Sequence, residues 1–97
     1  MSRNLTIHPG LLFKEDILEF NKLSITEAVK LLGITRINLS NIVNEKTSIT
    51  PNMAIRISKV FGGSPDLWLK LQMKYDLANA EEEFEKENNH LERFKYA

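Results

Sequence analysis

The chain has 97 residues, of which 42% are hydrophobic and 27% charged, and its formal net charge is zero. This length allows one hydrophobic core and excludes a second one, and the chain is too apolar to be disordered. It has no cysteine, which excludes disulfides and thiolate metal sites, and no apolar run approaches the roughly 20 residues that span a bilayer. We therefore expect a cytoplasmic protein with no signal peptide and no membrane partner.

The zero net charge is a cancellation between two parts of the chain. Residues 1–74 carry ten Lys and Arg against six Asp and Glu, a balance of +4. Residues 75–97 carry three against seven, a balance of −4. This asymmetry predicts one anionic and one cationic partner, and the alternative is an acidic, solvated end that has no partner.

Helix-capping signals divide the chain into five predicted helices. The first spans about residues 9–21, because Pro9 suits a first turn and the apolar residues after it have roughly helical spacing. The second spans residues 24–32, because Ser24 and Glu27 form a capping box and Gly33 tolerates the left-handed backbone of a helix stop. Its predicted inward residues are Ala28, Leu31 and Leu32.

The fourth and fifth predicted helices begin with the same pair of signals. Thr50-Pro51 and Ser64-Pro65 each place a capping side chain before a first-turn proline, and Gly62-Gly63 ends the fourth helix. The predicted inward residues of the fourth helix are Met53, Ile57, Val60 and Phe61, and the fifth helix carries Leu67, Trp68, Leu71 and Tyr75. No segment alternates with period two for long enough to predict a strand, so the predicted fold class is all-α.

The second and third predicted helices, joined by a turn at Gly33-Ile34, have the spacing of a helix-turn-helix over about residues 24–44. Thr35 caps the third helix, which runs to about Asn44 and is followed by a loop at residues 45–49. At about 100° per residue, its core side holds Leu39, Ile42 and Val43, and its outer side holds Ile37, Asn41 and Asn44, flanked by Ser40. Arg36 lies near the core edge, from which its long side chain can reach forward.

The outer side of the third helix is predicted to read DNA bases. It is polar, short and rich in amides, whereas a merely solvated helix more often carries Lys and Glu. Asparagine can bind adenine through two hydrogen bonds, arginine can bind guanine, and Ile37 can pack on a thymine methyl group. The alternative for Ile37 is an ordinary apolar residue at the surface.

The chain resembles the HigA (VapI-like) antitoxin family of the Cro/CI-type helix-turn-helix superfamily. The resemblance covers about residues 7–80 and is most specific in the opening IHPG and in GGSPDLWLKLQMKYDL. The matching segments are residues 7–10, 23–33, 35–36, 44, 49–54 and 62–77. Because one helix-turn-helix reads only a short half-site, we expect a homodimer that binds a pseudo-palindromic operator in double-stranded DNA. The resemblance implies a five-helix repressor. It also implies that the protein represses its own operon and neutralises a RelE/HigB-like, mRNA-cleaving toxin.

The resemblance also assigns the DNA contacts by position. It implies base contacts from Thr35, Arg36, Ile37, Ser40 and Asn41, and phosphate contacts from Asn44, Lys46 and Thr47. One position departs from the family: a glycine usually follows the asparagine at position 44, and this chain has Glu45. A carboxylate that pointed at the DNA backbone there would repel phosphate.

The sequence predicts no enzyme, no metal site and no cofactor. His8 and His90 belong to no metal-ligand spacing, and no nucleophile–base pair, carboxylate pair or glycine-rich phosphate loop is recognisable. We expect His8 to be a structural residue beside the first helix.

Two alternatives to the antitoxin stay open. One is a stand-alone or phage-type repressor, which binds DNA and has no toxin. The other is a protein-interaction module that has lost DNA binding, and the zero net charge and Glu45 keep this alternative open.

The fifth helix and the C-terminal end are the predicted protein-binding parts. Trp68, Leu71 and Tyr75 form an apolar stripe, which we expect to contact the core or a second copy in a homodimer. We place the helix-turn-helix domain at residues 7–78 and an acidic extension at residues 79–97. On a helix, Ala80, Phe84, Leu91 and Phe94 would give this extension a narrow apolar stripe among glutamates. The extension is a candidate for toxin binding, and the first helix is the main rival.

Overall fold

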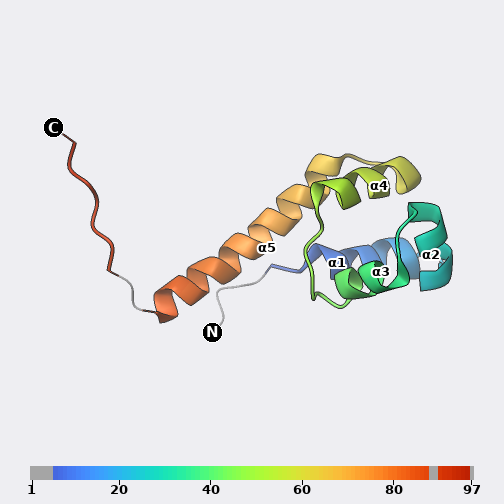
Figure 1. The fold of residues 1–97 in the computed structure, drawn as a ribbon, viewed down its shortest axis with the longest axis horizontal. Coiled ribbons are helices and arrows are strands. Elements are labelled where there is room, and N and C mark those ends of the chain that lie inside the picture. Colours follow the sequence, from blue (N-terminus) through green and yellow to red (C-terminus); the bar gives the residue numbers. More distant parts are fainter. Residues whose placement is uncertain (1–5, 88–89, 97) are drawn as a thin grey trace.

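The computed structural model describes residues 6–87 and 90–96, and its helices follow in the predicted order. These helices are α1 (Pro9–Leu12), the π-helical η1 (Phe13–Glu19), α2 (Ile25–Leu32), α3 (Arg36–Val43), α4 (Pro51–Phe61) and α5 (Pro65–Lys86) (Figure 1). Because α1 continues directly into η1, these are the five predicted helices. The two described ranges contain no strand, which confirms the all-α prediction.

Side-chain caps fix where the helices begin, as predicted. The Ser24 hydroxyl accepts from the Glu27 N–H (3.1 Å), and the Glu27 carboxylate accepts from the Ser24 N–H (2.9 Å), which completes the capping box of α2. The hydroxyls of Thr35, Thr50 and Ser64 accept from first-turn N–H groups of α3, α4 and α5. These bonds satisfy N–H groups that have no partner within the helix.

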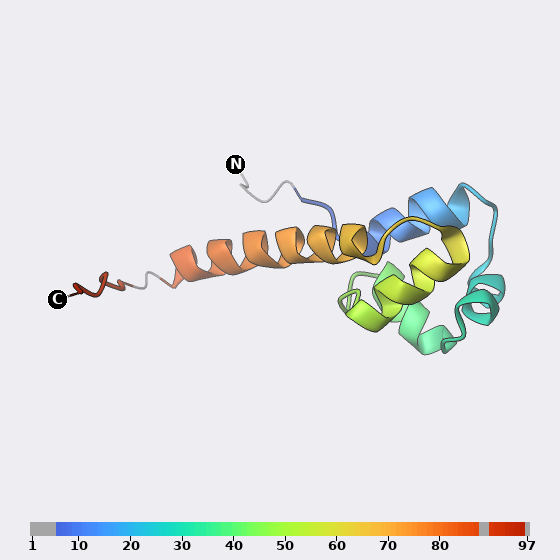
Figure 2. The ribbon, with the colours of Figure 1, turned by 90° about the horizontal axis from the view of Figure 1, so that it is seen from above.

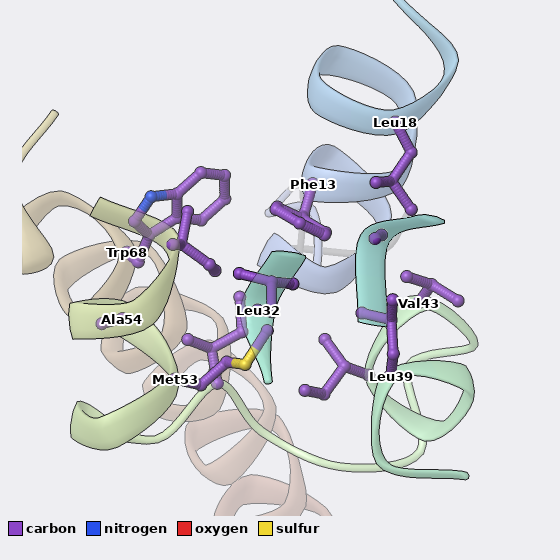
Figure 3. Close-up of a cluster of buried hydrophobic side chains, with 12 residues drawn as sticks. Phe13, Leu18, Leu32, Leu39, Val43, Met53, Ala54 and Trp68 are labelled. Atoms are coloured by element: carbon purple, nitrogen blue, oxygen red, sulfur yellow. The ribbon is translucent and has the colours of Figure 1, made fainter. Parts of the chain in front are cut away.

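Phe13 of η1 lies at the centre of the core and has no exposed surface. Its ring centroid is 5.8 Å from that of Phe61 and 5.9 Å from that of Trp68, both in edge-on contacts. Figure 3 shows Phe13 and Trp68 among the buried side chains of the core. The remaining buried hydrophobic residues are Leu18, Ala28, Leu32, Leu39, Ile42, Val43, Ile49, Met53, Ala54 and Ile57. The core therefore joins the two helices of the helix-turn-helix to η1, α4 and α5.

Two residues that we predicted to face inward lie at the surface instead. Leu31 is 51% exposed and Val60 38%, since each lies at the margin of the buried face of its helix. Conversely, the sequence pattern did not mark Phe13 as a core residue. In η1 hydrogen bonds span five residues, so the turn is wider and both Phe13 and Leu18 face the core.

The IHPG opening positions the first helix against α3. The His8 imidazole is buried and its Nδ1 accepts from the Gly10 N–H (2.8 Å), which caps α1. A Cβ atom at Gly10 would lie 1.9 Å from the carbonyl oxygen of Ile42, so only glycine allows this approach of the two helices. The His8 ring also meets the edge of Tyr75, with centroids 4.9 Å apart. His8 is thus a structural residue, as predicted.

α5 is the longest helix, and only its N-terminal half packs against the other helices. That half contacts α1 and α4, while the C-terminal half extends away from the bundle (Figure 2). α5 runs past residue 78 without a break, so the first part of the predicted extension is the end of α5. Residues 90–96 are exposed and not helical, so Leu91 and Phe94 do not continue the apolar stripe as a helix. None of the described helices is long and apolar enough to cross a membrane.

Candidate DNA interface

α3 presents one face to the core and the other to solvent, as its sequence predicts. Leu39, Ile42 and Val43 are buried between α3 and the other helices. On the opposite side Ile37 is 74% exposed, which is a large exposed fraction for an isoleucine on a structured helix. Asn44, at the end of the same side, is also exposed. The outer side of α3 is therefore available to a partner.

The five predicted base-contacting residues lie on the first two turns of α3, but their side chains are not equally available. Thr35 uses its hydroxyl to cap the helix, accepting from the Asn38 N–H (3.1 Å). The Arg36 guanidinium is exposed and donates from Nη2 to the Thr26 hydroxyl of α2. That bond occupies one of its five donors and leaves the others for a partner. Ser40 and Asn41 are half-buried.

The C-terminal end of α3 is a Schellman motif with Glu45 in the position that glycine usually takes. The Lys46 N–H donates to the Asn41 carbonyl (2.8 Å) and the Glu45 N–H donates to the Ile42 carbonyl (3.1 Å). Glu45 has φ = 63°, a left-handed backbone that costs a residue with a side chain about 1–2 kcal/mol. This geometry explains why the resembling family usually has a glycine at this position. Glu45 makes the same turn, but its left-handed backbone is strained.

The predicted phosphate-contacting residues lie at this turn and in the loop after it. The Asn44 side chain folds back and donates to the carbonyl of Ser40 (2.9 Å). The backbone N–H groups of Lys46 and Thr47 both donate to the Asn41 carbonyl, while their side chains are exposed. A phosphate would therefore be met by the Lys46 and Thr47 side chains, and not by their N–H groups.

Gln72 of α5 anchors the far end of this loop, a contact that the sequence pattern did not predict. Its side chain is 5% exposed; Oε1 accepts from the Ile49 N–H (2.8 Å) and Nε2 donates to Asp76 (2.9 Å). A buried amide with both of its groups satisfied holds the loop in one conformation.

Arg56 of α4 is a second residue that sequence reasoning missed. Its Nη1 donates to the carbonyl oxygens of Leu32 (2.8 Å) and Gly33 (3.2 Å), and its Nε donates to the Asn52 side chain (2.7 Å). The carbonyls belong to the end of α2 and the turn before α3. The spacing of Asn52 and Arg56 indicates a pair on one face of α4, but their distant carbonyl partners cannot be read from the sequence.

The capping box of α2 stabilises the ionised carboxylate of Glu27 in the first turn of the helix. Hydrogen bonds from the backbone and the side chain of Ser24 hold the pKa of the Glu27 carboxyl below its ordinary value of 4.5. Glu27 is therefore ionised at neutral pH and stabilises the positive end of the helix dipole.

Within residues 6–87 and 90–96, no three metal-ligating side chains come together.

The structure places the three predicted dimer residues mainly against their own chain. Trp68 is 6% exposed and belongs to the core, and Leu71 and Tyr75 are half-buried. The exposed apolar side chains of α5 lie elsewhere on the helix: Met73 is 64% exposed and Leu77 56%. Trp68 therefore offers little surface to a second copy.

Comparison with known proteins agrees with this architecture. The helix-turn-helix family matches residues 17–68, more than half of the chain. Virulence-associated protein A′ of Dichelobacter nodosus is 49% identical over 77 residues, which cover 78% of this chain. The chain spans just under two thirds of that relative, 66% of its length.

Two similar solved structures are HigA proteins. The Pseudomonas aeruginosa antitoxin HigA, solved with the higBA promoter, has a TM-score of 0.83 and 30% identity over 90% of this chain and 95% of its own. An addiction-module antidote protein of the HigA family from Coxiella burnetii has a TM-score of 0.79 and 32% identity over 91% of this chain and 97% of its own. The chain therefore belongs to the helix-turn-helix family, Cro/CI type, with the HigA (VapI-like) antitoxins as its relatives.

Proposed function

We propose that this protein is an antitoxin that binds an operator in its own promoter as a dimer and represses its operon. The observation that carries the proposal is the outer side of α3, where Ile37 is 74% exposed beside Arg36 while the opposite side is sealed into the core. Such a helix, held by a second one through a tight turn, is suited to the major groove. The relative from Pseudomonas aeruginosa was solved with promoter DNA, which supports the same use here.

In this proposal the base contacts come from Thr35, Arg36, Ile37, Ser40 and Asn41. The first turn of α3 enters the major groove first, so Arg36 and Ile37 make the main contacts to the base edges. Asn41, one turn later, makes a further base contact. Asn44, Lys46 and Thr47 meet phosphate and fix the position of α3 along the duplex. The Glu45 carboxylate, next to Lys46, weakens this electrostatic contact.

The proposal includes a homodimer because one helix-turn-helix reads only a short half-site. Operators of this class are usually pseudo-palindromic, with half-sites about one helical turn (34–36 Å) apart. Two copies related by a two-fold axis match such a sequence.

The second partner in this proposal is a RelE/HigB-like toxin that cleaves mRNA. A protein that handles RNA is basic, and the C-terminal part of this chain carries an excess of four negative charges over residues 75–97. Because α5 carries several of these glutamates away from the bundle, they are accessible to a basic partner. DNA binding and the lack of cysteine both suit the cytoplasm.

The test has two arms, both with the full chain. In the first, fluorescence anisotropy measures binding to DNA from upstream of the gene, with a shuffled duplex as the control, at low and moderate salt. We expect specific binding that weakens as salt rises. Equal affinity for both duplexes would contradict a sequence-specific repressor.

In the second arm, the chain is co-expressed with the product of the adjacent reading frame, and only that product carries an affinity tag. We expect co-purification and relief of the toxicity of the adjacent product. Promoter binding without co-purification would favour the stand-alone repressor. Co-purification without promoter binding would favour the interaction module.

A further inference from the structure

Gln72 is a polar side chain on the face of α5 that packs against the core. Among the residues that the structure describes, only His8 and Gln72 are buried polar side chains. The His8 imidazole caps the helix that follows it. The Gln72 amide instead reaches 23 positions back along the chain, to the Ile49 N–H (2.8 Å). Burial of an amide costs free energy that an apolar side chain would not cost. The amide at this position therefore has a role that packing alone does not explain.

The bond to Ile49 fixes the far end of the loop at residues 45–49, which runs from α3 to α4 past α5 (Figure 1). The near end is fixed by the Asn41 carbonyl, which accepts from the Lys46 and Thr47 N–H groups (2.8 and 3.3 Å). Ile49 is also 2% exposed, so its side chain is packed as well. The exposed side chains of Lys46 and Thr47 therefore project from a loop that is held at both ends.

We propose that Gln72 is a positioning residue for DNA binding: by anchoring Ile49, it holds the Lys46 ammonium where a DNA phosphate can meet it. The proposal rests on the proposed DNA-binding function and adds a residue of α5 that is buried and does not itself contact DNA. A side chain on an ordered loop loses less conformational entropy when it binds, so it contributes more affinity.

The charges of the loop make it especially dependent on this anchor. Glu45 and Lys46 are adjacent, exposed and of opposite sign, so together they add no net charge. Attraction to a phosphate then requires that the ammonium is held closer to it than the carboxylate. In a loosened loop both side chains sample similar distances from the phosphate, so attraction and repulsion cancel. Without a carboxylate at position 45, Lys46 would attract phosphate even from a loosened loop.

Asp76 fixes the direction of the Gln72 amide. Nε2 of Gln72 donates to Oδ1 of Asp76 (2.9 Å), four residues further along α5. A carboxylate can only accept and the Ile49 N–H can only donate, so the amide oxygen has to face Ile49 and the amide nitrogen has to face Asp76. Asp76 is thus the second member of the anchor, although its negative charge by itself opposes DNA binding.

The first test uses Gln72→Met, in which a side chain of similar length makes neither hydrogen bond. Fluorescence anisotropy measures binding to the operator and to a shuffled duplex over a range of salt concentrations. We expect the dissociation constant to rise about tenfold for both duplexes at low salt, because phosphate contacts do not depend on sequence. The slope of log affinity against log salt should become shallower by about one for each bound copy, as for one lost phosphate contact.

Leu18→Val is the matched control for a general loss of stability. It also alters a buried side chain, but it breaks no hydrogen bond of the loop. Circular dichroism shows that each variant is folded, and light scattering shows that its mass is unchanged. The control should keep the salt slope of the wild type. An unchanged slope for Gln72→Met, or an equal change in Leu18→Val, overturns the proposal.

The second test asks whether Gln72 acts through Lys46. In a Lys46→Ala background, Gln72→Met should no longer change the salt slope, because the charge that it positions is already absent. In a Glu45→Gln background, Gln72→Met should weaken binding less than it does in the wild type. Equal effects of Gln72→Met in all three backgrounds overturn the proposal.

The third test separates the Asp76 acceptor from its charge. Asp76→Asn removes the charge and keeps Oδ1 as an acceptor, whereas Asp76→Ala removes both. Repulsion alone predicts that the two variants bind DNA equally well, and more tightly than the wild type. The anchor predicts that Asp76→Ala binds at least about threefold more weakly than Asp76→Asn. Equal affinities of the two variants overturn the role of Asp76.

Amide hydrogen exchange separates the anchor from the proposed function, because it needs no DNA. The Ile49 N–H should be protected in the wild type, and Gln72→Met should raise its exchange rate at least about tenfold more than Leu18→Val does. If Gln72→Met lowers both protection and salt slope while the wild type binds the two duplexes equally, the anchor stands and the sequence-specific repressor is wrong. If the wild type is specific for its operator and Gln72→Met changes neither quantity, the repressor stands and the anchor is wrong. A wild type that binds neither duplex contradicts both.

Discussion

The Arg56 guanidinium of α4 donates from Nη1 to the carbonyl oxygen of Leu32, 2.8 Å away, at the end of α2. The same nitrogen reaches the Gly33 carbonyl in the turn that leads to α3. One side chain thus satisfies the Leu32 carbonyl, which has no partner within α2, together with a carbonyl of the turn, and it ties the helix-turn-helix to α4.

Replacing Arg56 by alanine is expected to lower the free energy of unfolding by about 1–3 kcal/mol, because these charge-assisted hydrogen bonds are lost. Urea denaturation measures the change. The control is Lys59→Ala, which removes an exposed cation from the same helix and should change stability by less than about 0.5 kcal/mol. Equal stability of the two variants would show that Arg56 does not brace the turn.

Substitutions at Glu45 separate backbone strain from charge. Glu45→Gly is expected to raise the free energy of unfolding by up to about 1 kcal/mol, because glycine adopts the left-handed backbone without strain, offset in part by its freedom when unfolded. It should also bind DNA more tightly, since a carboxylate next to Lys46 is removed. The control Glu45→Gln removes the charge and keeps the strain, so only its DNA affinity should rise. Denaturation and anisotropy measure the two quantities, and a stability gain in both variants would contradict the strain.

The capping box of α2 predicts a pH dependence. The pKa of Glu27 is lower in the folded chain than in the unfolded chain. The ionised carboxylate therefore adds its full contribution to the free energy of unfolding above the ordinary pKa of 4.5. This contribution is lost as the pH falls through the lowered pKa of the folded chain. The variant Glu27→Gln can still accept from the Ser24 N–H but does not titrate. We expect the wild type to be more stable than this variant at pH 7 and the difference to shrink in acid. If the wild type and Glu27→Gln differ in free energy of unfolding by the same amount from pH 7 to pH 3, the Glu27 carboxylate does not stabilise the fold through its charge.

Local signals explain why so much of the fold could be predicted. The hydroxyls of Ser24, Thr35, Thr50 and Ser64 cap the helices that they were predicted to begin, because a cap involves only residues within three positions along the chain. The two sides of α3 followed from its helical period alone. The base-contacting and phosphate-contacting roles remain predictions.

Long-range contacts explain what could not be predicted. Arg56 and Leu32 are 24 positions apart, and Gln72 and Ile49 are 23 apart, so no local pattern connects them. The apolar spacing of α5 also did not distinguish residues that face the core, such as Trp68, from those that face outward. Burial in the folded chain makes that distinction.

The most direct test of the account is the operator affinity of variants on the outer side of α3. Arg36→Ala and Asn41→Ala should each weaken binding by about 1–3 kcal/mol, as expected for a lost base contact. Thr26→Val is the matched control, because it removes the hydrogen bond that Arg36 makes within the chain and leaves the guanidinium in place. We expect this control to bind as the wild type does. If Arg36→Ala and Asn41→Ala also bind the operator as tightly as the wild type, α3 does not read the DNA.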